Sequence, residues 1–358
     1  MKLDFLKKEK QSPLKNFESF NEYITPKTMI VMEKYDLGND EYENEEEKLL
    51  REMYSSKKSY HLHDILAITG LSKIVDIKKK ILKSSICPDI FLNNRIVNTE
   101  QIPFEYLNEI FENLYKEEIR MYAVLKLTEI TQSDLNEKIK ATIVNWLIQV
   151  HFRFKLRDET LFLAIHLLDR FLTVKFIKRR RLQVLAITCL LIACKYEEIF
   201  SPEIRDLVCI LDKRCSVEDI LQAEVEILKV LKFEVTIPSV LRYFEILATK
   251  FDFTTEAYLF GKYLLELSLL FWKMRNRLNC LIASSVCYMI LKIFYDEDFK
   301  LQEKINQFYS LINFKQEEIE ECVLNLCFVL DNVKSSNFLS SVRKYMSQEY
   351  LEVANNFP

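Results

Sequence analysis

The uninterrupted apolar stretch Leu182–Cys194 constrains the fold most strongly. Of its thirteen residues only Gln183 and Thr188 are polar, and it contains no glycine or proline. A helix that is apolar on every side either crosses a membrane or lies at the centre of a helical bundle. A membrane span needs about 20 such residues, and this run lies between Lys178–Arg181 and the charged segment Lys195–Glu198. We therefore expect a central helix with other helices packed around it.

Glycine is scarce along the whole chain. It occurs three times in 358 residues, whereas an average protein contains about 7% glycine. Tight hairpins need residues with positive φ, most often glycine, so a sheet built from short hairpins has few suitable turns here. With 49% hydrophobic residues the chain can still bury a sizeable core. We predict an all-α fold.

Charge and side-chain chemistry exclude several classes of protein. The net charge of −3 argues against a dedicated nucleic-acid binder, whose binding surface would be basic. Nine cysteines form no CxxC pair, four histidines have no metal-ligand spacing, and no phosphate loop or catalytic arrangement occurs. We expect no enzymatic activity, metal or cofactor, and no nucleic-acid or membrane partner. The first ten residues are charged, so we also expect no signal peptide and cysteines that act as core hydrophobes.

Apolar spacing and helix-start signals predict a five-helix unit between Asp134 and Leu231. Asp134 with Glu137 has the pattern of a capping box, Ser201–Pro202 offers an N-cap with a first-turn proline, and Ser216 begins the last helix. A second set follows whose third helix is again apolar nearly all round, which indicates a repeat of the first unit. Its helices are expected at Val240–Phe251, Glu256–Leu270, Leu278–Phe294, Leu301–Leu311 and Glu317–Asn332.

The segments beside these units differ from them. Residues 1–103 contain the acidic stretch Asp40–Glu47, and we expect an arm that is partly disordered with short helices. Tyr106, Ile110 and Leu114 have helical spacing, which predicts an amphipathic helix at about 104–120. The predicted domains are the arm (1–103), the helix and first unit (104–235), the second unit (236–335) and a C-terminal extension (336–358).

Lys195 is the first candidate for a functional residue. It ends the apolar run, and an unpaired buried ammonium is unfavourable, so it needs a carboxylate such as Glu224 or Glu226. An ion pair inside the protein is the simpler interpretation. The alternative is a pair at the rim of the bundle, where the ammonium also reaches a partner chain.

Two further features admit a structural and a functional interpretation. The cations Lys178–Arg181 oppose the dipole at the start of the central helix; they could form a docking surface, a nuclear import signal or solvated packing ends. Trp146 has the spacing of a core residue, but an exposed Trp146 beside Ile143 and Arg179 would anchor a docked peptide.

Several ordered stretches resemble the cyclin family. Those that resemble the first cyclin box are Asn145–His151, Leu167–Leu172, Arg181–Gln183 and Ala193–Ile199. Those that resemble the second box of A- and B-type cyclins are Phe233, Pro238 and Tyr263–Ser268. The resemblance covers about residues 104 to 350 and is strongest to the G2/mitotic, B-type cyclins.

This resemblance implies two tandem five-helix cyclin boxes with an N-terminal helix packed on the first. It also implies a regulatory subunit, in the nucleus and cytoplasm, that binds and allosterically activates a cyclin-dependent protein kinase at the G2/M transition. The residues that match the family's kinase contacts are Lys195, Glu224, Tyr196, Glu198, Ile199, Leu228, Phe233, Tyr106 and Ile110. Those that match its docking patch for peptides of substrates or inhibitors are Ile139, Thr142, Ile143, Trp146, Arg179 and Gln183.

Some positions depart from the family pattern. Ile139 stands where methionine is usual, Thr142 where an aliphatic residue is usual, and Asn145 where aspartate is usual, so we expect altered peptide docking. The main alternatives are a transcriptional cyclin, which the second-box resemblance disfavours, and a double-box transcription initiation factor. The latter carries an N-terminal zinc ribbon, but the first hundred residues contain a single cysteine, Cys87.

Overall fold

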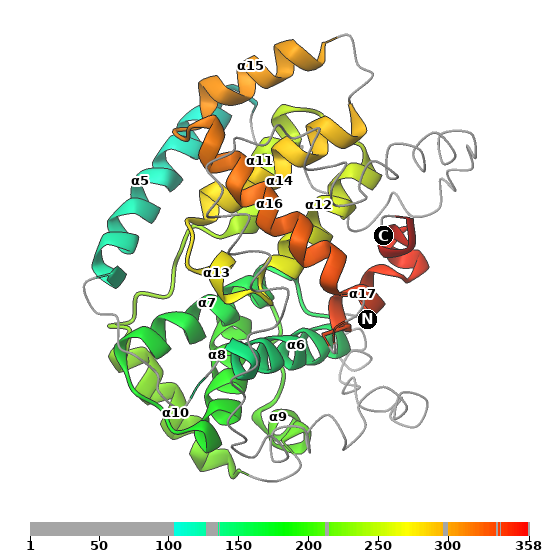
Figure 1. The fold of residues 1–358 in the computed structure, drawn as a ribbon. Coiled ribbons are helices and arrows are strands. Elements are labelled where there is room, and N and C mark those ends of the chain that lie inside the picture. Colours follow the sequence, from blue (N-terminus) through cyan, green and yellow to red (C-terminus); the bar gives the residue numbers. More distant parts are fainter. Residues whose placement is uncertain are drawn as a thin grey trace, which may run out of the picture. The chain divides into compact units, whose positions relative to one another are not determined.

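The described part of the chain is helical, as predicted. The computed structural model describes residues 104–126, 135, 137–211, 215–295, 300–333, 336 and 338–356, and no strand occurs among them (Figure 1). The predictions for the arm and for Asp134 lie outside these residues. The first box consists of the helices α6 (Glu137–Phe154), α7 (Asp158–Val174), α8 (Leu182–Glu197), α9 (Ile204–Ile210) and α10 (Val217–Val230).

The apolar run forms α8, the central helix of the first box. Every residue from Leu185 to Cys194 is buried, and α7, α10 and α6 pack around the helix. Thr188, the polar residue of this stretch, donates its hydroxyl to the carbonyl of Val184 at 2.7 Å. The hydroxyl is therefore satisfied within the helix, and the expectation of a central helix is confirmed.

The second box repeats this arrangement. Its central helix is α14 (Asn279–Phe294), in which every residue from Cys280 to Leu291 is buried. It packs against α11, α16 and α12, so it occupies the place that α8 has in the first box. A short helix, α13 (Trp272–Arg275), was not predicted. The other helices of this box are α11 (Val240–Lys250), α12 (Thr255–Ser268), α15 (Leu301–Leu311) and α16 (Gln316–Val333).

Of the two helix-start signals predicted at Ser201 and Ser216, one is confirmed and one is wrong. At the start of α10 the hydroxyl of Ser216 accepts the N–H of Asp219 at 3.1 Å, and the carboxylate of Asp219 accepts the N–H of Ser216 at 2.7 Å. This is a reciprocal capping box. The Ser201 hydroxyl instead donates to the carbonyl of Pro202 at 3.4 Å. Helix α9 therefore begins later than predicted, with Glu203 at the N-cap position.

The N-terminal helix α5 (Leu107–Lys126) follows a short 3-10 turn, η3 (Phe104–Tyr106). Its main contacts are with α11 of the second box, so the predicted packing on the first box is wrong. The buried carboxylate of Glu118 gives the physical reason. It accepts hydrogen bonds from the backbone N–H groups of Asn279 and Cys280, which are unpaired donors at the positive end of α14.

The C-terminal residues connect the two boxes. Helix α17 (Ser340–Tyr345) packs against α6 of the first box and α12 of the second. The ammonium of Lys344, with a side chain 1% exposed, binds the carboxylates of Glu266 at 2.6 Å and Asp158 at 3.2 Å. Lys262 binds Asp158 as well. The segment predicted as an extension is therefore packed between the boxes. The last elements are η5 (Gln348–Tyr350) and α18 (Val353–Asn356).

Cofactor and membrane features can be assessed for the described residues alone. None of the helices in those ranges is long and apolar enough to cross a membrane. Within the same ranges, no three or more His, Cys, Asp or Glu side chains gather as a metal site would require. The cysteines that the structure describes are free, and all but Cys209 are buried. Burial raises the pKa of Cys194 to about 12, which keeps this thiol protonated and unreactive.

Candidate functional site

The side chains of Lys195 and Glu224 meet at the surface of the first box. Lys195 lies in the last turn of α8 and Glu224 lies in α10, which packs against α8. The ammonium and carboxylate are 2.5 Å apart, and the side chain of Lys195 is 46% exposed whereas that of Glu224 is 14% exposed. The pair therefore lies at the rim rather than inside the protein. An ammonium has three donors, so Lys195 can bind an oxygen of another chain while it stays paired.

Glu226, the other carboxylate that the sequence offered to Lys195, has different partners. It binds Lys175 at 2.8 Å and Arg181 at 2.7 Å. Burial opposes the charge of Glu226, but the hydrogen bonds and charges of Arg181 and Lys175 outweigh it and lower the pKa. Part of the basic run before α8 is thus neutralised within the first box.

Large apolar side chains are exposed at the ends of the two helices that carry the pair. Tyr196 is 52% exposed, Ile199 is 91% exposed, and Phe233, which follows α10, is 68% exposed. Sequence reasoning missed Phe200, which is 85% exposed. The sequence feature that could have indicated its exposure is the apolar dipeptide Ile199–Phe200, which lies directly before the helix-breaking residues Ser201–Pro202. Exposed apolar patches of this kind mark interaction sites.

The outer side of α10 continues this apolar surface. Leu228 is half-buried, while Leu221 and Val225 are exposed. Leu221, Val225 and Leu228 recur at the spacing of one helix face, which leaves this face of α10 open. Sequence reasoning identified only Leu228 of the three.

Backbone geometry fixes the position of Phe233. Its φ is 62° and that of Lys232 is 53°, so the chain leaves α10 through left-handed conformations that L-residues rarely adopt. The N–H of Phe233 donates to the carbonyl of Leu228 at 2.9 Å, a bond typical of a Schellman helix end. The hydroxyls of Tyr196 and Thr236 lie 2.6 Å apart. This hydrogen bond ties the end of α8 to the segment that follows Phe233.

The remaining residues matched to kinase contacts have less open positions. The carboxylate of Glu198 accepts the N–H of Arg157 at 2.7 Å and the hydroxyl of Thr160 at 2.6 Å, so it holds the start of α7 from within the first box. Tyr106 is exposed in η3, and Ile110 is half-buried in α5. Both belong to the part of the chain that packs on the second box.

The residues matched to the docking patch are all buried or half-buried. Ile143 is 1% exposed and Trp146 is 6% exposed, so of the two interpretations of Trp146 the core position is confirmed and the exposed anchor is wrong. Ile139 and Thr142 are half-buried on the same helix, α6. The hydroxyl of Thr142 donates to the carbonyl of Lys138 at 2.7 Å and is thus satisfied within the helix. Of the four α6 residues matched to the patch, Ile139 and Thr142 are therefore the two that remain partly exposed to solvent.

The other two patch residues and the adjacent amides belong to different elements. Arg179 and Gln183 are half-buried at the start of α8. On α6, Asn145 accepts the N–H of Ser340 at 3.1 Å, and Gln149 donates to the Ser340 hydroxyl at 2.8 Å. Ser340, the first residue of α17, therefore forms hydrogen bonds with both amide side chains. The sequence did not indicate this pairing.

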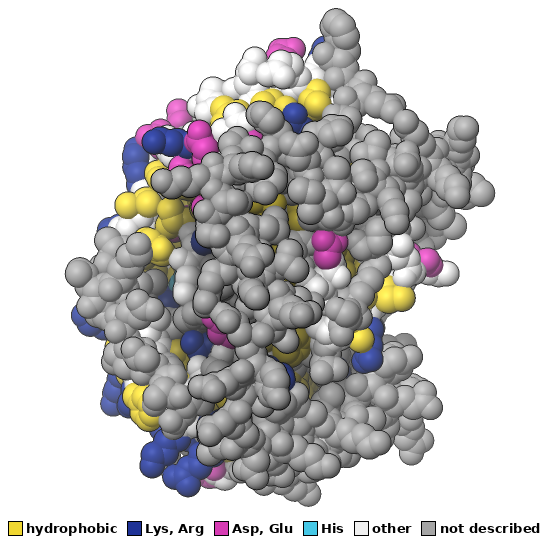
Figure 2. Space-filling view, viewed as in Figure 1, with side chains coloured by type: hydrophobic (Ala, Val, Ile, Leu, Met, Phe, Trp, Pro, Cys, Tyr) yellow, Lys and Arg dark blue, Asp and Glu magenta, His cyan; other side chains and the backbone are white. Residues whose placement is uncertain are grey.

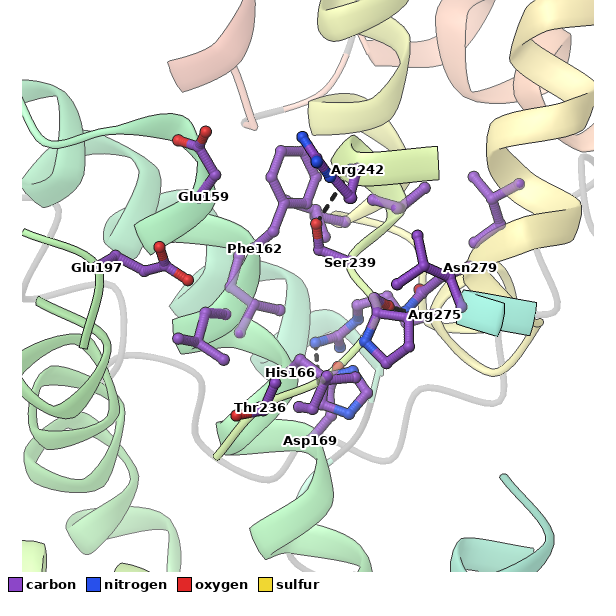
Figure 3. Close-up of a pocket in the computed structure, with 18 of the residues that line it drawn as sticks. Glu159, Phe162, His166, Asp169, Glu197, Thr236, Ser239, Arg242, Arg275 and Asn279 are labelled. Atoms are coloured by element: carbon purple, nitrogen blue, oxygen red, sulfur yellow. Dashed lines mark hydrogen bonds and ion pairs between the residues drawn. The ribbon is translucent and has the colours of Figure 1, made fainter. Parts of the chain in front are cut away.

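A cleft of about 270 Å³ lies between the two boxes (Figure 3). Burial, and then the charge of Arg170, lowers the pKa of His166 to about 3, so this histidine of the cleft is uncharged. Burial, and then the charge of Glu159, raises the pKa of Glu197 and Glu245. Tyr196, which follows Lys195 in α8, also lines the cleft. The cleft therefore opens beside the Lys195–Glu224 pair.

Comparisons with known proteins agree with this architecture. The profile described as "Cyclin, N-terminal domain" matches residues 109–236, and the one described as "Cyclin, C-terminal domain" matches residues 232–356. These two matches cover the described helices from α5 onward. They also divide the chain between α10 and α11, where the first box ends and the second begins.

Three similar proteins are described as G2/mitotic-specific cyclins of the B type. A G2/mitotic-specific cyclin-B of Dictyostelium discoideum is 32% identical over 250 residues, which cover 70% of this chain and 56% of the relative. A G2/mitotic-specific cyclin-B of Hydra vulgaris is 31% identical, with 70% and 67% covered. The G2/mitotic-specific cyclin-B2 of Homo sapiens is 29% identical over 271 residues, which cover 75% of this chain and 66% of the relative.

The chain thus matches from just over half to about two thirds of the length of these relatives. Together with the two matched domains, these similarities show that the chain belongs to the cyclin family, among relatives of the B type.

Proposed function

We propose that this chain is a regulatory subunit that binds a cyclin-dependent protein kinase and activates it allosterically. The observation that supports this most directly is the Lys195–Glu224 pair. Its carboxylate is mostly buried and its ammonium is nearly half exposed, at a distance of 2.5 Å. The carboxylate fixes the ammonium in place before a partner arrives, so little side-chain freedom is lost on binding.

The proposed mechanism is selection of the active kinase conformation. A protein kinase is active only when its strand lysine pairs with the glutamate of its mobile C helix and its activation loop is correctly placed. A rigid partner that binds this conformation alone increases its population. Inverting a 1:99 equilibrium requires about 5.5 kcal/mol of preferential binding.

The exposed apolar side chains can supply this energy. Complete burial of one large apolar side chain contributes about 1.5–3 kcal/mol. Tyr196, Ile199 and Phe233 are each more than half exposed, so covering all three yields about 5–9 kcal/mol as an upper bound. The Lys195 ammonium also orients the bound kinase, because it binds only a carbonyl or carboxylate oxygen that lies within hydrogen-bond distance.

The finer assignments are part of the same proposal. The relatives are described as G2/mitotic-specific, and we place this chain's action at the G2/M transition and in mitosis, in the nucleus and cytoplasm. We also assign to the surface around Ile139 and Thr142 a role in docking peptides of substrates or inhibitors.

An activity assay tests the proposal. The full chain is mixed with a mitotic-type cyclin-dependent kinase subunit, and phosphorylation of histone is measured. We expect strong activation by the unmodified chain and by Lys315→Ala, which removes an exposed lysine of the second box. Lys195→Ala should activate poorly at subsaturating concentration. If the chain binds the kinase but leaves its rate unchanged, the proposed mechanism is wrong.

A further inference from the structure

The surface assigned above to peptide docking is bordered by positive charge. We infer that it selects peptides whose aliphatic residues are flanked by acidic residues, rather than by basic ones. This inference rests on the proposed docking role and specifies its ligand. It follows from the arrangement of α6, α7 and α8 and from the side chains at their ends.

The basic run before α8 lies at the end of the first box where α6 begins. Residues 155–157 alone separate α6 from α7, and the Nε2 atom of His151, near the end of α6, lies 2.8 Å from the carbonyl oxygen of Arg157, directly before α7. The two helices also pack on each other, so α7 runs back along α6. The bond from the N–H of Arg157 to Glu198 joins the start of α7 to the end of α8, so α8 runs back along α7. Helices α6 and α8 consequently start at the same end of the box.

Two cations of the run remain available at this end. Arg181 is neutralised by Glu226, and Arg179 is half-buried. Lys178 and Arg180 are exposed, and neither has a carboxylate partner among the described residues. Lysine and arginine side chains also gather at the lower left edge of the face in Figure 2.

Few groups on α6 could attract a basic peptide beside this patch. The α6 residues that continue the patch are the amides Asn145 and Gln149, and both are bound to Ser340. Glu137, in the first turn of α6, is the exposed acid nearest to Ile139 along this helix, and Lys138 follows it directly. An arginine or lysine of a peptide would therefore meet mainly cations here, which disfavours its binding.

Charge should decide specificity because the apolar part of the surface is small. Ile143 and Trp146 are buried, which leaves Ile139 and Thr142 as the apolar contacts that α6 offers. A shallow contact of this size gives little affinity by burial. Exposed ion pairs are individually weak, but two or three of them can then determine which of two peptides binds.

The test uses two fluorescein-labelled peptides with the same aliphatic centre, one flanked by glutamates and the other by lysines. Binding to the full chain is measured by fluorescence anisotropy at low salt. We expect the acidic peptide to bind more tightly, with a preference that weakens as salt screens the charges. The double variant Lys178→Glu/Arg180→Glu should bind the acidic peptide about 3- to 10-fold more weakly.

A matched control separates local charge from net charge. Arg205→Glu/Lys315→Glu changes one arginine and one lysine, both exposed on other elements, and alters the net charge equally. It should bind the acidic peptide as the unmodified chain does. An equal loss in both double variants would mean that the effect is not local and would overturn the inference.

The remaining outcomes distinguish this inference from the function on which it rests. Tighter binding of the lysine-flanked peptide would overturn the charge preference while leaving the docking role intact. If neither peptide binds to a chain that still activates the kinase, the docking role itself fails. If a single-stranded oligonucleotide displaces the acidic peptide and loses affinity in Lys178→Glu/Arg180→Glu, the surface is a nucleic-acid site and the inference is wrong.

Discussion

Replacing Lys344 by methionine should severely destabilise the protein. The side chains of Lys344 and Glu266 are 1% and 2% exposed, and their charged atoms lie 2.6 Å apart. Burial alone would lower the pKa of Lys344, but the charges of Glu266 and Asp158 outweigh burial and raise it. The substitution leaves Glu266 buried without its cation, whereas Asp158 keeps Lys262. Breaking a buried pair in this way lowers the free energy of unfolding by about 3–5 kcal/mol.

Urea unfolding followed by circular dichroism measures this loss. The midpoint urea concentration of Lys344→Met should fall at an unchanged slope, since the slope follows the surface exposed on unfolding. The matched control is Lys315→Met, which removes an exposed lysine and should change stability by less than about 0.5 kcal/mol. The double variant Lys344→Met/Glu266→Met should recover most of the loss, because two apolar side chains then replace a buried ion pair.

The double variant decides whether this reasoning is correct. A loss below about 1 kcal/mol in Lys344→Met would show that the pair is not desolvated as its burial implies. A double variant as unstable as the sum of both single variants would show that the two charges act independently. Either result would contradict the conclusion that the buried ion pair of Lys344 stabilises the packing of α17 between the boxes.

Three smaller perturbations follow from local geometry, each measured by urea unfolding. Ser216→Ala removes the capping box of α10 and should lower stability by about 1 kcal/mol; an unchanged midpoint would contradict this. A Cβ at Gly261 would lie 2.1 Å from the Phe244 ring, so Gly261→Ala should lower stability by about 1–3 kcal/mol, and a gain would show that the ring can move aside. Burial, and then the charge of Lys344, lowers the pKa of His151 to about 4. Because its unfolded pKa is near 6.5, stability should fall as the pH drops from about 6.5 towards 4, by up to about 1.4 kcal/mol per pH unit. His151→Gln should reduce this slope, and an unaltered slope would exclude His151 as its source.

The sequence predicted the helices well because their signals are local. Apolar spacing and the scarcity of glycine located the helices of both boxes except α13, and the last helix of the first box starts at Ser216 as predicted. The start of α9 was wrong because the hydroxyl of Ser201 bonds to a carbonyl instead of an N–H group. A serine before proline offers both partners, and only the folded backbone decides between them.

The sequence predicted most of the residues of the candidate site, but it did not predict well which of their side chains are exposed to solvent. Lys195 required a carboxylate. Helical spacing alone offered both Glu224 and Glu226, the family resemblance singled out Glu224, and the packing of α10 on α8 places Glu224 beside Lys195. Trp146 is buried, which its spacing along α6 favoured, but only the packing of the neighbouring helices excludes the exposed alternative. The bonds of Ser340 to Asn145 and Gln149 join residues nearly two hundred positions apart, which no local pattern reveals.

The affinity of the kinase subunit for the full chain and for Lys195→Ala tests the central claim most directly. Isothermal titration gives both dissociation constants, and circular dichroism confirms that the variant is folded. Because the interface would enclose the ammonium and leave its partners unpaired in the variant, the proposal predicts a loss of about 2–5 kcal/mol, which is at least about 30-fold in Kd. Equal dissociation constants would contradict the account, because Lys195 would then lie outside the kinase interface.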